Sequence, residues 1–182
     1  PPEKLKDEIL NTDEVCIAFN NAFLNCNEEL FSGILDIRFS GSTCVTVLTM
    51  GQKLFCSNVG DSRGIIVKRK QGTVSGKIIA QAIQEIKNHA KLMKLQEKQN
   101  GGRIDSFRDP DNNPIGPLRV WLKNEDIPGL AMTRSFGDEV ASRVGVTAEP
   151  GKLFNIKNHN NNFIEILELD LCPDDRFIVL AS

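Results

Sequence analysis

Residues 40–70 read SGSTCVTVLTMGQKLFCSNVGDSRGIIVKRK and give the clearest structural signal in the chain. Three short β-type runs, 43–49, 53–58 and 63–70, are separated by the turn sequences MGQ and GDS. Val, Ile and Thr fit a pleated sheet, whereas Gly and Asp mark chain reversals. The stretch predicts a β-meander with Asp61 at a tight turn between the second and third strands.

Two interpretations of Asp61 follow from this position. An Asp in a turn can accept a hydrogen bond from the backbone of its own turn. A carboxylate at the edge of a sheet is also placed to meet a metal ion or a phosphate. The local sequence favours the first interpretation and leaves the second open.

The composition is that of one ordinary globular domain. The 182 residues are 40% hydrophobic and 25% charged, with a formal net charge of −2. A net charge this close to zero does not indicate a surface that binds nucleic acid. No apolar run approaches the roughly 20 residues of a membrane span. We therefore expect a soluble protein that binds neither nucleic acid nor membrane, and we also expect it to be a monomer.

The cysteine pattern bears on the compartment. Five cysteines, an odd number, are scattered without C-x-x-C spacing, which disfavours a disulfide framework and a structural zinc site. We expect a reducing compartment, the cytoplasm or the nucleus. The cysteines are Cys16, Cys26, Cys44, Cys56 and Cys172.

Apolar residues at spacings of three and four predict two helices. The first covers 13–26, with Asp13 and Glu14 favourable in its first turn, and should pack on a sheet. The second covers 84–99 and ends at NGG, residues 100–102. The stripe of the first helix is Val15, Ala18, Phe19, Ala22, Phe23 and Cys26, and that of the second includes Ile86, Ala90 and Met93.

Residues 103–129 are predicted to be loop-rich, because DPDNNP at 109–114 is incompatible with regular structure. Acidic and amide residues there match the first ligand positions of a calcium loop. However, Pro114 stands where that loop needs Gly, and Val120 where it needs Glu. A surface turn is the better interpretation, with Trp121 in a short strand or anchor beneath it.

Further strands are predicted at 78–83, 153–156, 163–169 and 176–181. The last is a continuous apolar run, which is typical of a strand buried on both faces. The sequence stops at Ser182, directly after this run. From this we expect the chain to be the central piece of a longer protein.

The residues alone predict no mechanism. The sequence contains no phosphate-binding Gly-rich loop, zinc-protease motif or nucleophile elbow. His89 and His159 are far apart in sequence, and adjacent acids at 125–126, 138–139 and 174–175 are typical of solvated loops.

Several segments together resemble a known family, the metal-dependent Ser/Thr protein phosphatases of the 2C type. Their order and spacing match that family over about residues 12–182. The segments are SGST (40–43), NVGDSR (58–63), NGGRI (100–104), RVWL (119–122), PGLAMTRSFGD (128–138), AEP (148–150) and RFIVLAS (176–182).

The resemblance implies an α+β fold, a β-sandwich of two antiparallel sheets flanked by helices, here incomplete. Residues 1–182 would form a single partial phosphatase domain, with the family's flap at 103–130. The implied reaction is hydrolysis of phosphoserine and phosphothreonine in phosphoproteins. Two Mg²⁺ or Mn²⁺ ions, held by carboxylates, would polarise a bridging water that attacks phosphorus.

The family's phosphate-binding Arg and DGHGG motif precede the first predicted helix, and its next metal-binding Asp follows the AS at which this sequence stops. We therefore expect no catalytic residue in this span and no activity of the span alone. Asp61 matches the Asp of the family's GDSR, which can serve an additional, weaker metal position. Arg63, Arg134 and Asp138 match motif positions that look structural in the family.

Two further departures concern the rim where substrate and partners would bind. NHAK at 88–91 replaces the family's DHKP, and 152–162 resembles an insertion. The alternative function is a non-catalytic adaptor, a pseudophosphatase that binds a signalling partner through the face of its flap.

Overall fold

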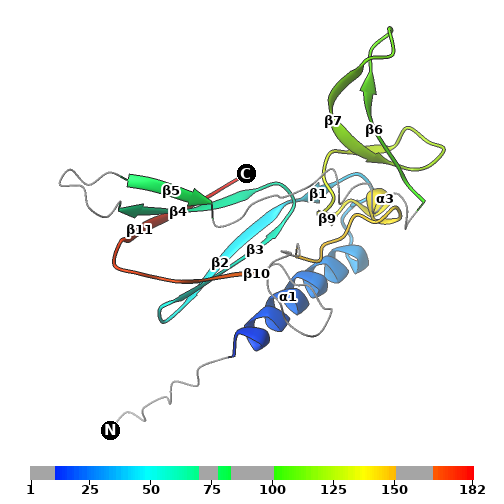
Figure 1. Cartoon of the computed structure of the whole chain (residues 1–182). Helices are drawn as coiled ribbons and strands as arrows, with labels where there is room; N and C mark the ends of the chain where they lie inside the picture. Colours follow the sequence, from blue (N-terminus) through cyan, green and yellow to red (C-terminus); the bar gives the residue numbers. More distant parts are fainter. Residues whose placement is uncertain (1–10, 70–77, 83–100, 151–165) are drawn as a thin grey trace.

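The computed structural model of the chain describes residues 11–69, 78–82, 101–150 and 166–182. Figure 1 shows two layers of strands, a long helix beside one of them, and a hairpin that projects from one end. The elements are α1 (Thr12–Ser32), β1 (Gly41–Ser42), β2 (Cys44–Met50), β3 (Lys53–Val59), β4 (Arg63–Arg69), β5 (Ile78–Ala82), β6 (Arg103–Arg108), β7 (Pro114–Trp121), β8 (Pro128–Leu130), β9 (Phe136–Gly137), α3 (Glu139–Ser142), β10 (Ile166–Asp170) and β11 (Asp175–Ala181).

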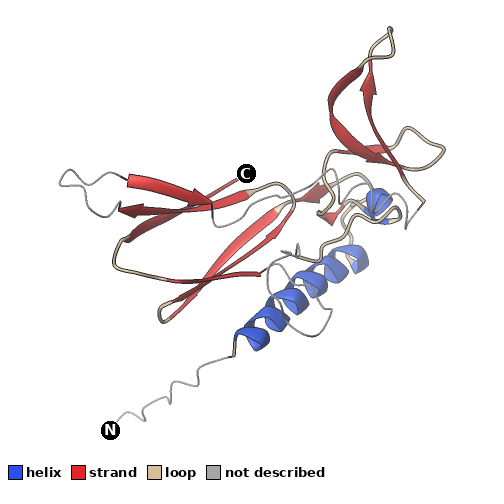
Figure 2. Ribbon diagram, viewed as in Figure 1, coloured by secondary structure: helices blue, strands red, loops and turns tan. Residues whose placement is uncertain are grey.

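Two three-stranded antiparallel sheets form a sandwich (Figure 2). One has the strand order β10-β3-β2 and the other β11-β4-β5. Leu54 and Cys56 from the first sheet pack against Ile66 of the second, and each is at most 2% exposed. This core confirms the predicted α+β sandwich. Partly buried residues around it are Val45, Val47, Leu167, Leu169, Leu171 and Ile178.

The predicted strand at 176–181 joins the second sheet beside β4. Ile178 lies opposite Ile66, and Ala181 lies opposite Arg63. The last segment of the chain therefore completes a sheet begun more than a hundred residues earlier.

The predicted meander is wrong at its third strand. β2 and β3 form the expected hairpin, but β4 belongs to the facing sheet. The reversal at 60–62, with Gly60 at φ 98°, carries the chain from one layer to the other. The turn between the second and third strands is confirmed, with Asp61 in it.

Helix α1 is confirmed but extends beyond 26 to Ser32. Its N-terminus has a capping box in which Asn11 and Glu14 satisfy each other's backbone amides. Val15 packs with Phe55 and Ile166 on the outer face of the first sheet, as predicted. The predicted stripe is only partly buried, because Ala18, Ala22 and Cys26 are exposed.

The prediction of a loop-rich segment at 103–129 is wrong. β6, β7 and β8 form a three-stranded antiparallel sheet. Only 109–113 forms the reversal, in which Asp109 accepts hydrogen bonds from the backbone and side-chain amides of Asn113. Pro114 begins β7, a position where a strand tolerates proline.

The prediction that both faces of the last strand are buried is also wrong. Phe177 is 52% and Val179 40% exposed, whereas Ile178 points into the sandwich. A continuous apolar run does not specify how many of its faces other elements cover. Here the face carrying Phe177 and Val179 is open to solvent.

Strands β5 and β10 confirm the predictions at 78–83 and 163–169 in their described parts. The predicted helix at 84–99, the strand at 153–156 and the insertion at 152–162 lie outside the described residues, as do His89 and His159. In the described part of the chain, no helix has both the length and the apolar character that crossing a membrane requires.

Candidate functional site

The turn that carries Asp61 is held by its neighbours. The Asn58 side chain donates a hydrogen bond to the Gly60 carbonyl oxygen over 3.0 Å. The hydroxyl oxygens of Thr43 and Ser62 lie 2.6 Å apart, and Ser62 is buried. A side chain at Gly60 would collide with Thr43, so the SGST and GDSR segments can interlock only with glycine at this position.

Asp61 itself is exposed at the tip of this turn. Among the described contacts, its carboxylate accepts no hydrogen bond from the turn backbone. The bonds that hold the turn come from Asn58, Thr43 and Ser62 instead. A purely local capping role, which the sequence favours, therefore has no contact to support it.

A third motif packs against the first. Strand β9 pairs with β1, with Gly137 opposite Gly41. Asp138 is buried, and its backbone adopts the left-handed conformation with φ 47°. Its backbone amide donates a hydrogen bond to the Ser40 carbonyl oxygen over 2.9 Å. The segments SGST, GDSR and SFGD thus meet at one end of the sandwich.

Helix α1 supports this end from the outer side. The Asn27 side-chain oxygen accepts a hydrogen bond from the Gly137 amide over 2.9 Å. The rings of Phe23 and Phe136 lie 5.4 Å apart in a buried cluster that also contains Val59. Sequence reasoning missed these supports, because a contact between residues 110 positions apart has no local signal.

The acidic residues at this end do not make a metal centre. Among the described residues, no group of three or more His, Cys, Asp or Glu side chains is arranged to hold an ion. Mg²⁺ and Ca²⁺ take about six or more oxygen ligands, and Asp61 alone supplies one carboxylate. The described residues therefore do not fit a dinuclear metal site, and a metal role for Asp61 stays a prediction.

The other acids of the sequence analysis have structural partners. Asp126 pairs with Arg103 at 2.6 Å, and Glu139 pairs with Arg143 at 2.7 Å. Asp175 lies 3.1 Å from the Lys68 ammonium nitrogen. These ion pairs give the adjacent acids structural roles, so a catalytic role is not needed to account for them.

The β6–β7 hairpin has a rigid base. Trp121 is 5% exposed, and its indole nitrogen donates to the Asp105 carbonyl oxygen over 2.9 Å. The Phe107 ring stands edge-on to Trp121 at 5.2 Å. The guanidinium of Arg103 lies over the Trp121 ring at 5.3 Å, and that of Arg119 lies over the Phe107 ring at 4.9 Å. The predicted anchoring role of Trp121 is confirmed.

Comparison with known proteins shows the family. The family model for protein phosphatase 2C matches residues 3–182. The chain is 34% identical over 166 residues to "Probable protein phosphatase 2C 64" of Oryza sativa subsp. japonica, covering 91% of this chain and 34% of that protein. It is 28% identical over 176 residues to "Probable protein phosphatase 2C 35" of Arabidopsis thaliana, covering 91% of this chain and 47% of that protein.

Solved structures share the fold. A serine-threonine phosphatase 2C from Toxoplasma gondii superposes with a TM-score of 0.60 at 18% identity, over 92% of this chain and 48% of that one. A C. elegans sex determining protein superposes with a TM-score of 0.51 at 17% identity, over 99% of this chain and 34% of that one. The chain thus spans between a third and a half of the length of each of these four proteins.

Proposed function

This chain belongs to the protein phosphatase 2C family, and we propose on that basis that the protein is a metal-dependent hydrolase of phosphoserine and phosphothreonine in phosphoproteins. The family match over almost the whole chain carries the proposal. Three family signature segments meet at one end of the sandwich, and this arrangement supports the proposal. The segments are SGST, GDSR and SFGD.

The metal is Mg²⁺ or Mn²⁺ in this proposal. The 2C-type phosphatases are a metal-dependent family, and hard divalent ions prefer carboxylate oxygens. Asp61 is exposed at the end of the sandwich and is a candidate for an additional ion. Carboxylates outside the described ranges would hold the principal ions, because the described donors do not fit them.

A phosphate-release assay tests the activity. Full-length protein, stripped of metal, is given a phosphothreonine peptide with Mn²⁺ or Mg²⁺, and a phosphotyrosine peptide serves as the specificity control. We expect release from the phosphothreonine peptide that a chelator abolishes. Absence of release with either metal contradicts the proposal and favours the non-catalytic adaptor.

The 182-residue chain is the second arm of this assay. We expect it to release no phosphate with either metal, since its described residues form no metal-binding group. Turnover by this chain that a chelator abolishes contradicts this expectation.

We also propose that the protein works as a monomer in the cytoplasm or nucleus. Free thiols at all five cysteines fit a reducing compartment. Size-exclusion chromatography with light scattering tests the monomer, and cell fractionation tests the compartment.

A further inference from the structure

The segment that joins α1 to β1, residues 33–40, lies on the surface beside β9 and α3 (Figure 1). The backbone amides of residues 138–140 each donate a hydrogen bond to a carbonyl oxygen of this segment, over 2.9 to 3.2 Å. The acceptors are Ile37, Arg38 and Ser40. The backbone of the segment is therefore held in place, although Ile37 is its only residue that is not fully exposed.

This held segment and the last turn of α1 present large apolar side chains to solvent. Ile34 is fully exposed, and Leu35 is 65% exposed. Phe31 and Phe39 are 42% and 59% exposed. The first three fall within residues 31–35, so they lie close together on the surface. Exposed apolar side chains gathered on a held backbone are typical of an interaction surface.

The end of α1 beside these side chains is acidic. Glu28 precedes Phe31 by three residues, and residues three apart are neighbours on a helix surface. Glu29 follows it, and the last turn of α1 contains no basic residue. The helix dipole already places partial negative charge at this end, so two carboxylates here favour a nearby cation.

The described part of the chain does not supply that cation. None of its ion pairs includes Glu28 or Glu29. The basic residues of the neighbouring segments have carboxylates of their own, because Arg38 pairs with Asp36 at 2.6 Å and Arg143 pairs with the glutamate at position 139 at 2.7 Å. The charge of the two helix-end glutamates is thus left for a group outside this chain.

We propose that residues 28–39 form a docking site for a protein segment that carries lysine or arginine beside apolar side chains. The basic groups would meet Glu28 and Glu29, and the apolar side chains would cover Phe31, Ile34 and Leu35. Charge complementarity selects this occupant over an anionic membrane surface, which the same glutamates repel.

The docking site leads directly into the SGST segment at 40–43. Thr43 of that segment bonds to Ser62, the neighbour of Asp61. A bound partner would therefore lie beside the segment on which the Asp61 turn packs. The docking site does not depend on phosphatase activity, and binding tests it separately.

Fluorescence anisotropy with a labelled helical peptide of leucine and lysine tests the proposal on the 182-residue chain. We expect saturable binding that weakens as salt is added, since salt screens exposed charges beyond about 10 Å at 0.1 M. A twin peptide with glutamate in place of each lysine should not bind. A photoreactive group on the lysine peptide should crosslink to residues 28–39.

Two double variants remove the two halves of the site. Ile34→Ser/Leu35→Ser should weaken binding about tenfold or more, because it removes the apolar contact. Glu28→Lys/Glu29→Lys should weaken binding to a similar degree and abolish its weakening by salt. All four positions are exposed, so both variants should fold, and circular dichroism checks this.

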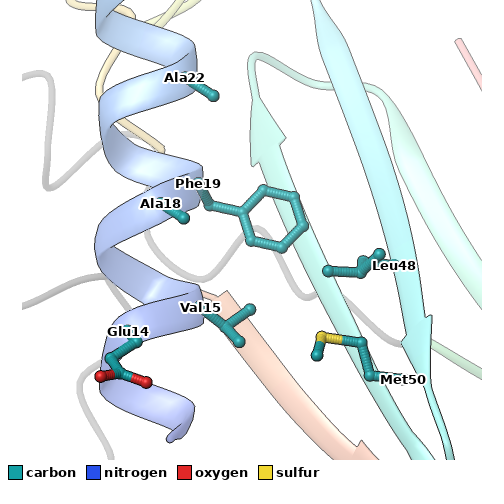
Figure 3. Close-up of a pocket in the computed structure, with 7 residues that line it drawn as sticks. All are labelled: Glu14, Val15, Ala18, Phe19, Ala22, Leu48 and Met50. Atoms are coloured by element: carbon teal, nitrogen blue, oxygen red, sulfur yellow. The ribbon is translucent and has the colours of Figure 1, made fainter. Parts of the chain in front are cut away.

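Each variant has a matched control. Ile17→Ser/Leu48→Ser makes the same chemical changes at exposed positions elsewhere. Leu48 lines the apolar groove between α1 and β2 (Figure 3), which is a competing surface for the leucine side chains. Asp111→Lys/Glu125→Lys makes the same change in net charge at exposed positions of other loops. Both controls should bind the lysine peptide as the parent chain does.

Absence of peptide binding would overturn the proposal, as would equal affinities of the parent and Ile34→Ser/Leu35→Ser. Crosslinks confined to the groove of Figure 3 would also contradict it. Binding to phosphatidylserine vesicles but not to phosphatidylcholine vesicles would identify a membrane surface instead. A dimer that Ile34→Ser/Leu35→Ser dissociates would identify a second copy of the chain as the occupant, and either result would replace the proposed partner.

Discussion

The carboxylate of Asp138 lies against the backbone of Gly41, so closely that any side chain at position 41 would overlap it. The carbonyl oxygen of Phe136 blocks the same space. The tight pairing of β1 with β9 therefore depends on a hydrogen atom in place of a Cβ at position 41. Two motifs nearly a hundred residues apart are joined through this contact.

The variant Gly41→Ala should destabilise the chain by about 2 kcal/mol or more, since inserting a methyl into close-packed backbone forces a shift. Urea denaturation followed by circular dichroism measures the loss. Gly51→Ala is the control, because the space around Gly51 is open and its positive φ of 58° costs only about 1 kcal/mol. Equal losses in both variants would contradict the close-contact account.

The Thr43–Ser62 hydrogen bond gives a second prediction. Thr43→Val and Ser62→Ala should each lower the free energy of unfolding by about 1–2 kcal/mol, because each leaves a hydroxyl unpaired. In the double variant the two losses should overlap, with a coupling of about 1 kcal/mol.

Ser57→Ala is the matched control for this cycle. Ser57 is fully buried, but its hydroxyl has no hydrogen-bond partner among the described residues. Removing that hydroxyl should therefore leave stability within about 0.5 kcal/mol or raise it. Additive losses at Thr43 and Ser62 would show that their hydrogen bond does not stabilise the fold.

The ion pair between Lys53 on β3 and Glu168 on β10 should make the stability of the fold depend on pH. Lys53 donates a hydrogen bond to Glu168, which lowers the pKa of that carboxyl, and Thr12 lowers it further. A lowered folded-state pKa contributes stability above the unfolded value of about 4.3 and loses it as pH falls through the folded pKa. The same bond raises the pKa of Lys53, so its contribution persists into the alkaline range.

Lys53→Met should therefore lower Tm between about pH 5 and pH 9, and the difference from the parent should shrink as the pH falls through the lowered pKa of Glu168. Thermal melts across this range measure it. Lys123→Met, at an exposed turn, is the control and should leave the profile unchanged. A Tm difference at Lys53 that stays constant down to pH 3 would exclude the ion pair as its cause.

The open face of the second sheet predicts the behaviour of the chain in solution. Phe177 and Val179 are 52% and 40% exposed, on a strand at the edge of its sheet. Apolar patches and free strand edges bind hydrophobic dyes and promote aggregation. The chain should enhance the fluorescence of such a dye, and the double variant Phe177→Thr/Val179→Thr should reduce that enhancement. A monomer that melts in one sharp transition without binding dye would contradict this.

Much of the fold could be predicted because its signals are local. Apolar spacing located α1, β-type runs located β2, β3, β4 and β11, and Gly with Asp marked the turn at Asp61. The order of the motifs was sufficient to identify the family, since each motif is short and contiguous in sequence. Asp61 could be placed in its turn, but its neighbours could not be foreseen.

Long-range packing settled the rest. Sheet membership depends on which strands pair across the chain, so β4 joined β11 in the layer facing β3. Exposure depends on what covers a face, so an apolar run at 177–180 became a half-open strand. The bond between Thr43 and Ser62 and the fit of Gly41 against Asp138 arise only when distant segments meet. Periodicity and turn chemistry act over a few residues, whereas these contacts depend on the three-dimensional path of the whole chain.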